Sequence, residues 1–199
     1  MDIGLYEATL RRTGELTRGL TAGDLRRPTP CVEWDVEHLV AHLVGANLVF
    51  GGVARRTPAA GAQDIMQADV GVLGEDPVAA YAASADLAVD AWRAYGPLEG
   101  TVPMPFGPSP AEAAITTHLA DNLIHQWDLA AALGLERSLD PAATAIAVAF
   151  TTRIADQMRG PGKPFGYVVA VPDDAPLHER WAGHMGRDPS RWPQSTVRG

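Results

Sequence analysis

Residues 109–134 read SPAEAAITTHLADNLIHQWDLAAALG and contain both ends and the apolar face of one long helix. Ser109, Pro110 and Glu112 match a capping box with proline at the first helical position, which predicts that the helix begins there. Gly134 readily adopts the left-handed conformation found just beyond a helix, so the helix is predicted to end at about residue 133. Its apolar face carries Leu119, Leu129, Ala130 and Leu133.

Five more helices are predicted on either side of this one. Apolar residues recur at helical spacing in the first three of these segments, and two segments begin with an aspartate cap followed by proline. The expected spans are 3–20, Asp35 to about Gly51–Gly52, Asp76–Pro77 to Gly96–Pro97, Asp140–Pro141 to Gly160, and 176–185. Four amphipathic helices with one or two more appended predict an all-α, up-down four-helix bundle.

The connections are predicted from their proline, glycine and polar residues. Residues 55–75 are expected to form a long loop with one irregular helical turn. Residues 97–110, PLEGTVPMPFGPSP, are expected to be a proline-rich connection and not a helix. Residues 166–171, GYVVAV, are expected to be extended or a short strand.

Length and composition are those of an ordinary globular chain, with 199 residues, 46% hydrophobic and 20% charged. We expect one domain over residues 1–199, with a core at about 3–159 and a C-terminal extension at about 160–199. The net charge of −8 argues against a nucleic-acid partner, because phosphate binding needs a basic surface. Neither a membrane span nor a signal peptide is expected, and the single cysteine, Cys31, agrees with a cytoplasmic location.

Two histidines and one aspartate are placed where two helices of a bundle could share a metal ion. Asp121 and His125 are one turn and about 40° apart on their helix, so both side chains can reach one point. His42 lies at the edge of an apolar stripe, where a polar side chain faces a neighbouring helix. Two imidazoles and a carboxylate suit Zn²⁺, with Ni²⁺ or Fe²⁺ as alternatives, and water or substrate would fill the open positions.

Ordinary structural interpretations stand beside this one. An Asp–His pair on adjacent turns commonly forms a surface hydrogen bond, and a single histidine on an apolar edge commonly belongs to the core. His118 is the main rival ligand, because it lies two turns from His125 on nearly the same face. His38 is expected to be a partly solvated neighbour of His42 or to orient a ligand. Surface positions are expected for His178 and His184.

Four further side chains could contribute to a site or only to structure. Asp128, one turn past His125, is expected to orient a ligand as an acceptor or to serve as a surface group or local cap. Trp34 and Trp127 could line a substrate pocket or simply fill the core. Cys31 is expected to be a small buried hydrophobe rather than a nucleophile.

Three blocks of sequence occur in a familiar order. They are TPCVEWDVEHLVAHLVG (29–45), DNLIHQWDLAAALG (121–134) and VPDDAPLHERWAGHMGRDP (171–189). Together they make the chain resemble the DinB-like superfamily, and within it the actinobacterial proteins similar to the N-terminal domain of mycothiol-dependent maleylpyruvate isomerase. The resemblance covers nearly the whole chain.

The resemblance implies a four-helix core that holds a metal through a histidine of the second helix and a carboxylate-x-x-x-His pair of a later helix. Carried over by position, these residues are His42, Asp121 and His125. It also implies a low-molecular-weight thiol cofactor, mycothiol or bacillithiol, used in isomerisation or S-transfer. The isomerase has Glu where this chain has Asp121, and it carries a C-terminal domain where this chain has a short tail, so maleylpyruvate is not the expected substrate.

Three functions follow as hypotheses. The first is a thiol-dependent isomerase or S-transferase, in which the metal lowers the pKa of a thiol that then attacks an electrophilic small molecule. The second is a hydrolase that uses metal-bound water. The third is a non-catalytic protein that binds a metal or small molecule. The expected partners are the thiol and the substrate, and the chain is expected to be a monomer or a homodimer.

Overall fold

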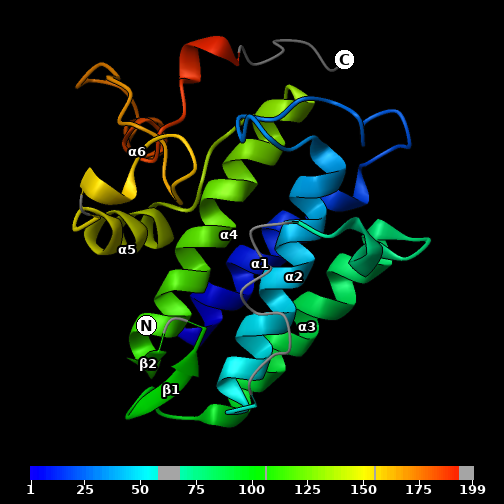
Figure 1. Cartoon of the computed structure of the whole chain (residues 1–199), viewed down its shortest axis with the longest axis vertical. Helices are drawn as coiled ribbons and strands as arrows, with labels where there is room; N and C mark the ends of the chain where they lie inside the picture. The colour runs from blue at the N-terminus through cyan, green and yellow to red at the C-terminus, as the bar shows by residue number, and fades with distance from the viewer. Residues whose placement is uncertain (58–67, 106, 155, 193–199) are drawn as a thin grey trace.

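Four long helices stand side by side and enclose the core, as Figure 1 shows. The computed structural model describes residues 1–57, 68–105, 107–154 and 156–192. Its helices are α1 (Ile3–Arg18), α2 (Val36–Ala54), α3 (Pro77–Tyr95), α4 (Ala111–Leu133), α5 (Pro141–Thr151) and α6 (Leu177–His184). Single turns of 3-10 helix are η2 (Val70–Leu73), η3 (Asp156–Met158) and η4 (Pro189–Arg191). The predicted all-α bundle is confirmed.

In the bundle, α1 and α4 run in one direction, and α2 and α3 run in the opposite direction (Figure 1). Asn47 Nδ2 donates to Ser84 Oγ at 3.0 Å, and Arg55 donates to the Leu87 carbonyl at 3.3 Å. The second contact lies further toward the C-terminus on both helices, so α2 and α3 are parallel. Both helices therefore begin at the same end of the bundle. The connection between them contains η2, the irregular turn expected within residues 55–75, while residues 58–67 lie outside the described part.

The start of α4 differs from the prediction. Residues 97–110 contain an antiparallel hairpin of β1 (Thr101–Met104) and β2 (Gly107–Pro110), in which Ser109 pairs with Val102. Pro110 is the residue before the helix and makes no side-chain cap, so the expected capping box is wrong. Glu112 instead accepts a hydrogen bond from the Met1 amino group at 2.8 Å. The backbone of Ser109 belongs to the hairpin, so it is not available as a helix cap.

Two other helix ends also differ. α2 continues through Gly51 to Ala54, and Gly51 lies close to α3: a Cβ there would meet the Leu87 side chain and lie 3.4 Å from Ala88 Cα. α5 ends at Thr151, well before the expected Gly160. Among the described residues after Thr151, Asp156–Met158 form η3, and Arg159 donates to the Gly166 and His184 carbonyls.

The core lies between the four bundle helices and includes large, fully buried side chains: Tyr6, Leu10, Leu39, Leu43, Tyr81, Trp92, Ile115, Leu119 and Leu123. By length and composition α2 could cross a membrane, which the sequence was not expected to allow. However, 72% of that segment is buried inside the bundle. Its apolarity is therefore accounted for by packing against α3 and α4.

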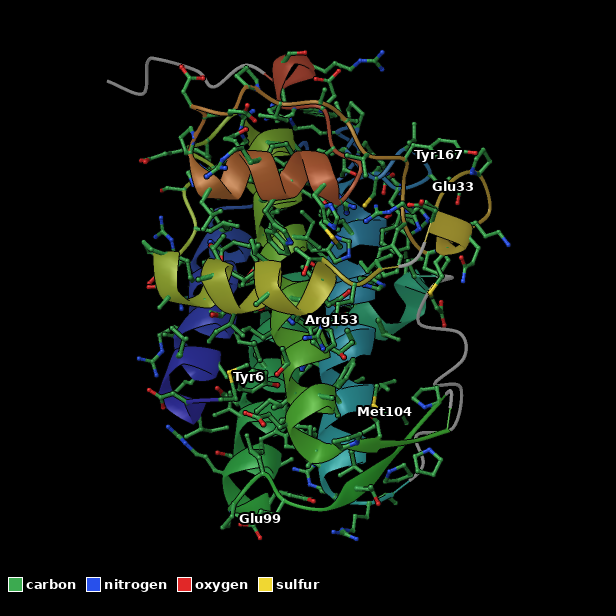
Figure 2. All side chains as sticks on the ribbon, turned by 90° about the vertical axis from the view of Figure 1, so that its left-hand side faces the viewer. Tyr6, Glu33, Glu99, Met104, Arg153 and Tyr167 are labelled. Carbon is green, nitrogen blue, oxygen red and sulfur yellow. The ribbon has the colours of Figure 1, made fainter. Side chains whose placement is uncertain are left out.

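The C-terminal extension packs against the bundle. Figure 2 shows α5 and α6 lying crosswise over α4. Residues 166–171 form neither a helix nor a strand, and the Val169 N–H donates to the Gly183 carbonyl of α6 at 2.9 Å. A buried hydrogen bond from Trp181 Nε1 to Thr151 Oγ1, at 2.9 Å, ties α6 to α5. The extension thus rests on the upper half of α4, the half that carries the candidate site.

Candidate metal centre

The structure brings His42, Asp121 and His125 together between α2 and α4. His42 Nε2 lies 3.3 Å from Asp121 Oδ1, and His125 Nε2 lies 3.5 Å from the same oxygen. One ligand atom from each residue lies within 4.8 Å of both others. Ligands about 2.0–2.1 Å from a tetrahedral zinc are separated by roughly 3.3–3.4 Å, so the measured spacings suit a metal of this size.

The local helix geometry explains why three separate residues converge. Asp121 and His125 are one turn apart on α4 and project in the same direction. α2 runs antiparallel to α4 in the bundle and presents His42 to them from the opposite side. The rings of His42 and His125 meet edge to face, with centroids 4.7 Å apart and planes at 71°.

The charges of the centre and one unpartnered carboxylate oxygen show whether its residues suit a metal ion. Burial alone would raise the pKa of Asp121, but the charges and hydrogen bonds of His42 and His125 hold it well below its usual range. Burial would likewise lower the pKa of His125, but the charge of Asp121 and hydrogen bonds to Asp121 and Asp128 raise it well above its usual range. Asp121 Oδ2 is buried and has no hydrogen-bond partner among the described residues. An unmatched carboxylate oxygen beside two imidazoles fits a divalent metal.

His125 has a second contact that fixes its ring. Its Nδ1 lies 3.0 Å from Oδ2 of Asp128, a fully buried aspartate. Arg187, from the segment after α6, donates to Oδ1 at 3.0 Å and to Oδ2 at 2.7 Å. Burial would raise the pKa of Asp128, but the charge of Arg187 and hydrogen bonds from His125 and Arg187 lower it to about 2. Asp128 is therefore a buried anion in contact with His125, and not the surface group that was one of the alternatives.

Cys31 joins this group; it was expected to be a small buried hydrophobe, but it is only partly buried and has polar neighbours. Its Sγ lies 3.4 Å from Asp128 Oδ2, 3.9 Å from His125 Nδ1 and 3.2 Å from an Arg187 nitrogen. Cys31, His125 and Asp128 also have a spacing that could hold a metal. The guanidinium of Arg187 already lies against Asp128 and Cys31 and would repel a metal ion placed between them. The set with His42 and Asp121 is therefore the stronger candidate for a metal site.

The two tryptophans named as pocket candidates lie in different places. The Trp34 ring stands 4.6 Å from the His42 ring and 5.8 Å from the His125 ring, centroid to centroid, so it covers the centre. Trp127 is fully buried and donates through Nε1 to Glu179 at 3.3 Å, within the packing of the extension. Trp127 thus packs against the extension and not beside the metal ligands, because it lies on a different face of α4 from His125.

The other histidines fall outside the ligand set. His118 is fully buried, stacks on Phe50 at 4.4 Å and hydrogen-bonds through Nδ1 to Tyr6 at 2.7 Å. Burial lowers its pKa to about 4. His38 is half-exposed and lies 2.6 Å from Asp35, the cap of α2. These contacts give His118 and His38 structural roles.

The tail histidines are less exposed than expected. His178 Nε2 lies 3.7 Å from Glu179, and His184 Nε2 lies 3.1 Å from Arg159 Nη2 and 3.2 Å from the Thr151 carbonyl oxygen. Both side chains are partly buried because the extension folds back against α4 and α5. Neither belongs to a ligand set among the described residues.

One important residue was missed from the sequence. Arg187 is largely buried, although arginine is rarely buried unless an acidic group pairs with it. Its position in the G-R-D-P tail marked it as part of the resemblance but did not reveal its partner. Asp128 is far away along the chain, and only the folding of the extension brings the two together.

The family model described as the mycothiol maleylpyruvate isomerase N-terminal domain matches residues 6–130. The chain belongs to this family. It is also 35% identical over 173 residues to the Mycobacterium tuberculosis proteins printed as uncharacterized proteins MT0763 (strain CDC 1551 / Oshkosh) and Rv0738 (strain H37Rv). The match covers 86% of this chain and 90% of each relative. No solved structure matches the chain significantly.

The family match confirms the resemblance; it covers the first sequence block and most of the second, and the third block (171–189) lies beyond it. It includes His42, Asp121, His125 and Asp128, and it ends before the extension that supplies Arg187. The relatives, in contrast, match over most of their length. Within this mycothiol-related family, the described residues offer ligand groups that fit a divalent metal.

Proposed function

We propose that this member of the mycothiol maleylpyruvate isomerase N-terminal domain family is a metal-dependent enzyme that uses a low-molecular-weight thiol, with mycothiol as the first candidate. His42, Asp121 and His125 would hold one divalent ion, Zn²⁺ first and Ni²⁺ or Fe²⁺ as alternatives. The observation that carries the proposal is the convergence of these three donors around a buried, unmatched carboxylate oxygen of Asp121. When bound, such an ion lowers the pKa of a coordinated thiol.

The protein's own residues would provide the setting for this chemistry. Three protein ligands leave coordination positions open for exogenous groups. The Asp121 side chain is 26% exposed, whereas His42 and His125 are 3% and 8% exposed. The exogenous thiol would therefore approach from the side of Asp121. Trp34 lies over both imidazole rings and would exclude water from them.

The substrate would be a small electrophile, and the outcome would be isomerisation or formation of a stable S-conjugate. The family name supports mycothiol as the cofactor. We also propose a cytoplasmic location and a monomeric or homodimeric state. A net charge of −8 supports the absence of nucleic-acid partners.

The test begins with elemental analysis of protein purified without a metal-affinity tag. The wild type should carry one divalent ion per chain. His42→Ala and His125→Ala should lose it, and His178→Ala should keep it as the matched control. A wild type that can be neither isolated with metal nor loaded with it would overturn the proposal.

Cobalt-substituted protein then tests the thiol. Mycothiol should produce a sulfur-to-cobalt charge-transfer band in the near ultraviolet, and S-methylated mycothiol should not. Turnover of an ester or amide without any thiol would support a hydrolase instead. Metal binding with no spectral response to mycothiol would leave a metal-binding protein that does not use this cofactor.

A further inference from the structure

The extension contributes a charged side chain directly beside the metal centre. Arg187 donates through Nε to Asp128 Oδ1 at 3.0 Å and through Nη2 to Oδ2 at 2.7 Å. Its third nitrogen, Nη1, donates to the Met185 carbonyl at 2.8 Å. The Asp128 side chain is fully buried and that of Arg187 is 11% exposed, so solvent screens this pair weakly. Both carboxylate oxygens are thereby held in one orientation.

That orientation determines what His125 can offer a metal. An ionised carboxylate only accepts hydrogen bonds, so the His125 Nδ1 that lies 3.0 Å from Asp128 Oδ2 must carry its proton. The proton on Nδ1 leaves the lone pair of Nε2 for a metal ion. Nε2 is the atom that lies 3.5 Å from Asp121 Oδ1 in the candidate centre. A carboxylate that orients a ligating histidine in this way also makes it a stronger ligand.

The backbone around Arg187 holds its side chain toward Asp128. α6 ends with the Arg187 N–H donating to the Ala182 carbonyl at 2.9 Å and the Gly186 N–H donating to the Gly183 carbonyl at 3.0 Å. Gly186 has φ +89°, and a Cβ there would lie 2.7 Å from the Gly166 Cα. The end of α6 thus packs against Gly166, with no room for a larger residue at position 186. The direction of Arg187 is set by this packing and not by the metal centre alone.

We propose that Arg187 is a positioning residue of the metal centre: it holds Asp128, which fixes His125 with Nε2 toward the metal. The extension, which lies outside the family match to residues 6–130, is then a working part of the site. The inference rests on the proposed metal binding by His42, Asp121 and His125. It goes further by assigning a role in that binding to a segment with no metal ligand of its own.

The test compares metal affinity in four proteins by competition with a chromogenic zinc chelator. Arg187→Met keeps most of the side-chain length and removes the donors, and it should weaken zinc binding about 10- to 100-fold. Arg187→Lys should recover only part of this loss, because one ammonium group cannot reproduce the two-pronged contact. Arg191→Met is the matched control, since Arg191 is in the same segment with its side chain 80% exposed, and it should bind zinc like wild type.

Loss of Arg187 leaves Asp128 buried and unpaired, so the single variant could bind poorly only because it unfolds. The double variant Asp128→Asn/Arg187→Met removes both charges and should recover the thermal stability that the single variant loses. Its zinc affinity should remain about 10-fold or more below wild type. In ¹⁵N spectra of the zinc-loaded wild type, the His125 proton should be found on Nδ1 alone. In the double variant, the His125 proton should no longer be confined to Nδ1.

The outcomes separate this inference from the proposed function. Wild-type zinc affinity and an Nδ1–H tautomer in a folded double variant would overturn the role of Arg187 while leaving metal binding intact. A wild type that binds no zinc would overturn the proposed function and this inference together. Weakened zinc binding in a stably folded double variant, with normal binding in Arg191→Met, would support the inference.

Discussion

His42 and Asp121 are 79 residues apart in the chain, yet Nε2 of one lies 3.3 Å from Oδ1 of the other. His125 reaches the same oxygen from one turn further along α4. The contact between His42 and Asp121 joins two helices, so it depends on the packing of the bundle. The following predictions test the centre and the packing that forms it.

Replacing Asp121 with Asn should abolish metal-dependent stabilisation. The amide keeps the size of the carboxylate but removes the negative charge between two imidazoles. A ligand present at 100 times its Kd stabilises the folded state by about 2.7 kcal/mol. Adding a strong chelator should therefore lower the free energy of unfolding of the zinc-loaded wild type by about this amount and leave Asp121→Asn unchanged, as measured by urea denaturation. An equal response of the two proteins would contradict the ligand assignment.

The fluorescence of Trp34 should report metal binding. Its ring lies 4.6 Å from the His42 ring, so an open-shell ion held by His42 would quench it strongly. Titration of wild type with Co²⁺ or Ni²⁺ should reduce tryptophan emission, and Trp34→Phe should lose most of that change. Trp92→Phe is the control, because Trp92 is on α3, which carries none of the three ligands. Quenching that persists in Trp34→Phe would place the ion elsewhere.

Stability should fall as the pH is lowered from about 6.5 toward 4, because of His118. Burial lowers its pKa to about 4 from the ordinary 6.5. Between these values the unfolded chain binds a proton that the folded protein excludes, so protonation favours unfolding and stability rises with pH. The full effect of such a shift is about 3 kcal/mol.

His118→Gln removes the titrating group and keeps an acceptor for the Tyr6 hydroxyl. Urea denaturation of metal-free protein between pH 4 and 7.5 should show a clearly shallower dependence in this variant. The raised pKa of His125 does not produce the same slope, since its contribution to stability declines only above about pH 6.5. Identical pH profiles for wild type and variant would show that His118 is not responsible.

Gly183→Ala should destabilise the extension and weaken the metal centre together. A Cβ at residue 183 would lie 2.7 Å from the Val169 carbonyl oxygen and 2.5 Å from Val171 Cγ2. Overpacking of this kind costs about 1–3 kcal/mol. Because α6 positions Arg187, zinc affinity should fall along with the melting temperature, measured by calorimetry and chelator competition.

Gly45→Ala provides the opposite control. Gly45 is inside α2 and a Cβ there would meet no atom within 4 Å, so alanine should stabilise the helix by up to about 1 kcal/mol. Its zinc affinity should match that of wild type. A gain in stability for Gly183→Ala would contradict the close packing of α6 against Val169 and Val171.

Local signals in the sequence placed most of the helices. The aspartate caps at Asp76 and Asp140 accept hydrogen bonds from the first turns of α3 and α5, and Gly134 ends α4 in the left-handed conformation. The same kind of signal failed at Ser109, which pairs in the hairpin, and at Gly51, where the helix continues in close contact with α3. In both cases the residue contacts another segment, which the local signal does not reveal.

The sequence by itself determined the helical bundle and the pairing of Asp121 with His125, because periodicity and caps are local properties and residues four apart on a helix share one face. It also indicated His42, first from its place at the edge of an apolar stripe and then from the family resemblance. Only the tertiary structure decided that Trp34 covers the centre, that Trp127 belongs to the extension, and that Arg187 holds Asp128. These contacts join segments that are far apart in the chain, so no periodic pattern in the sequence predicts them. They form only when the buried surfaces of α4, α6 and the loop before α2 pack together.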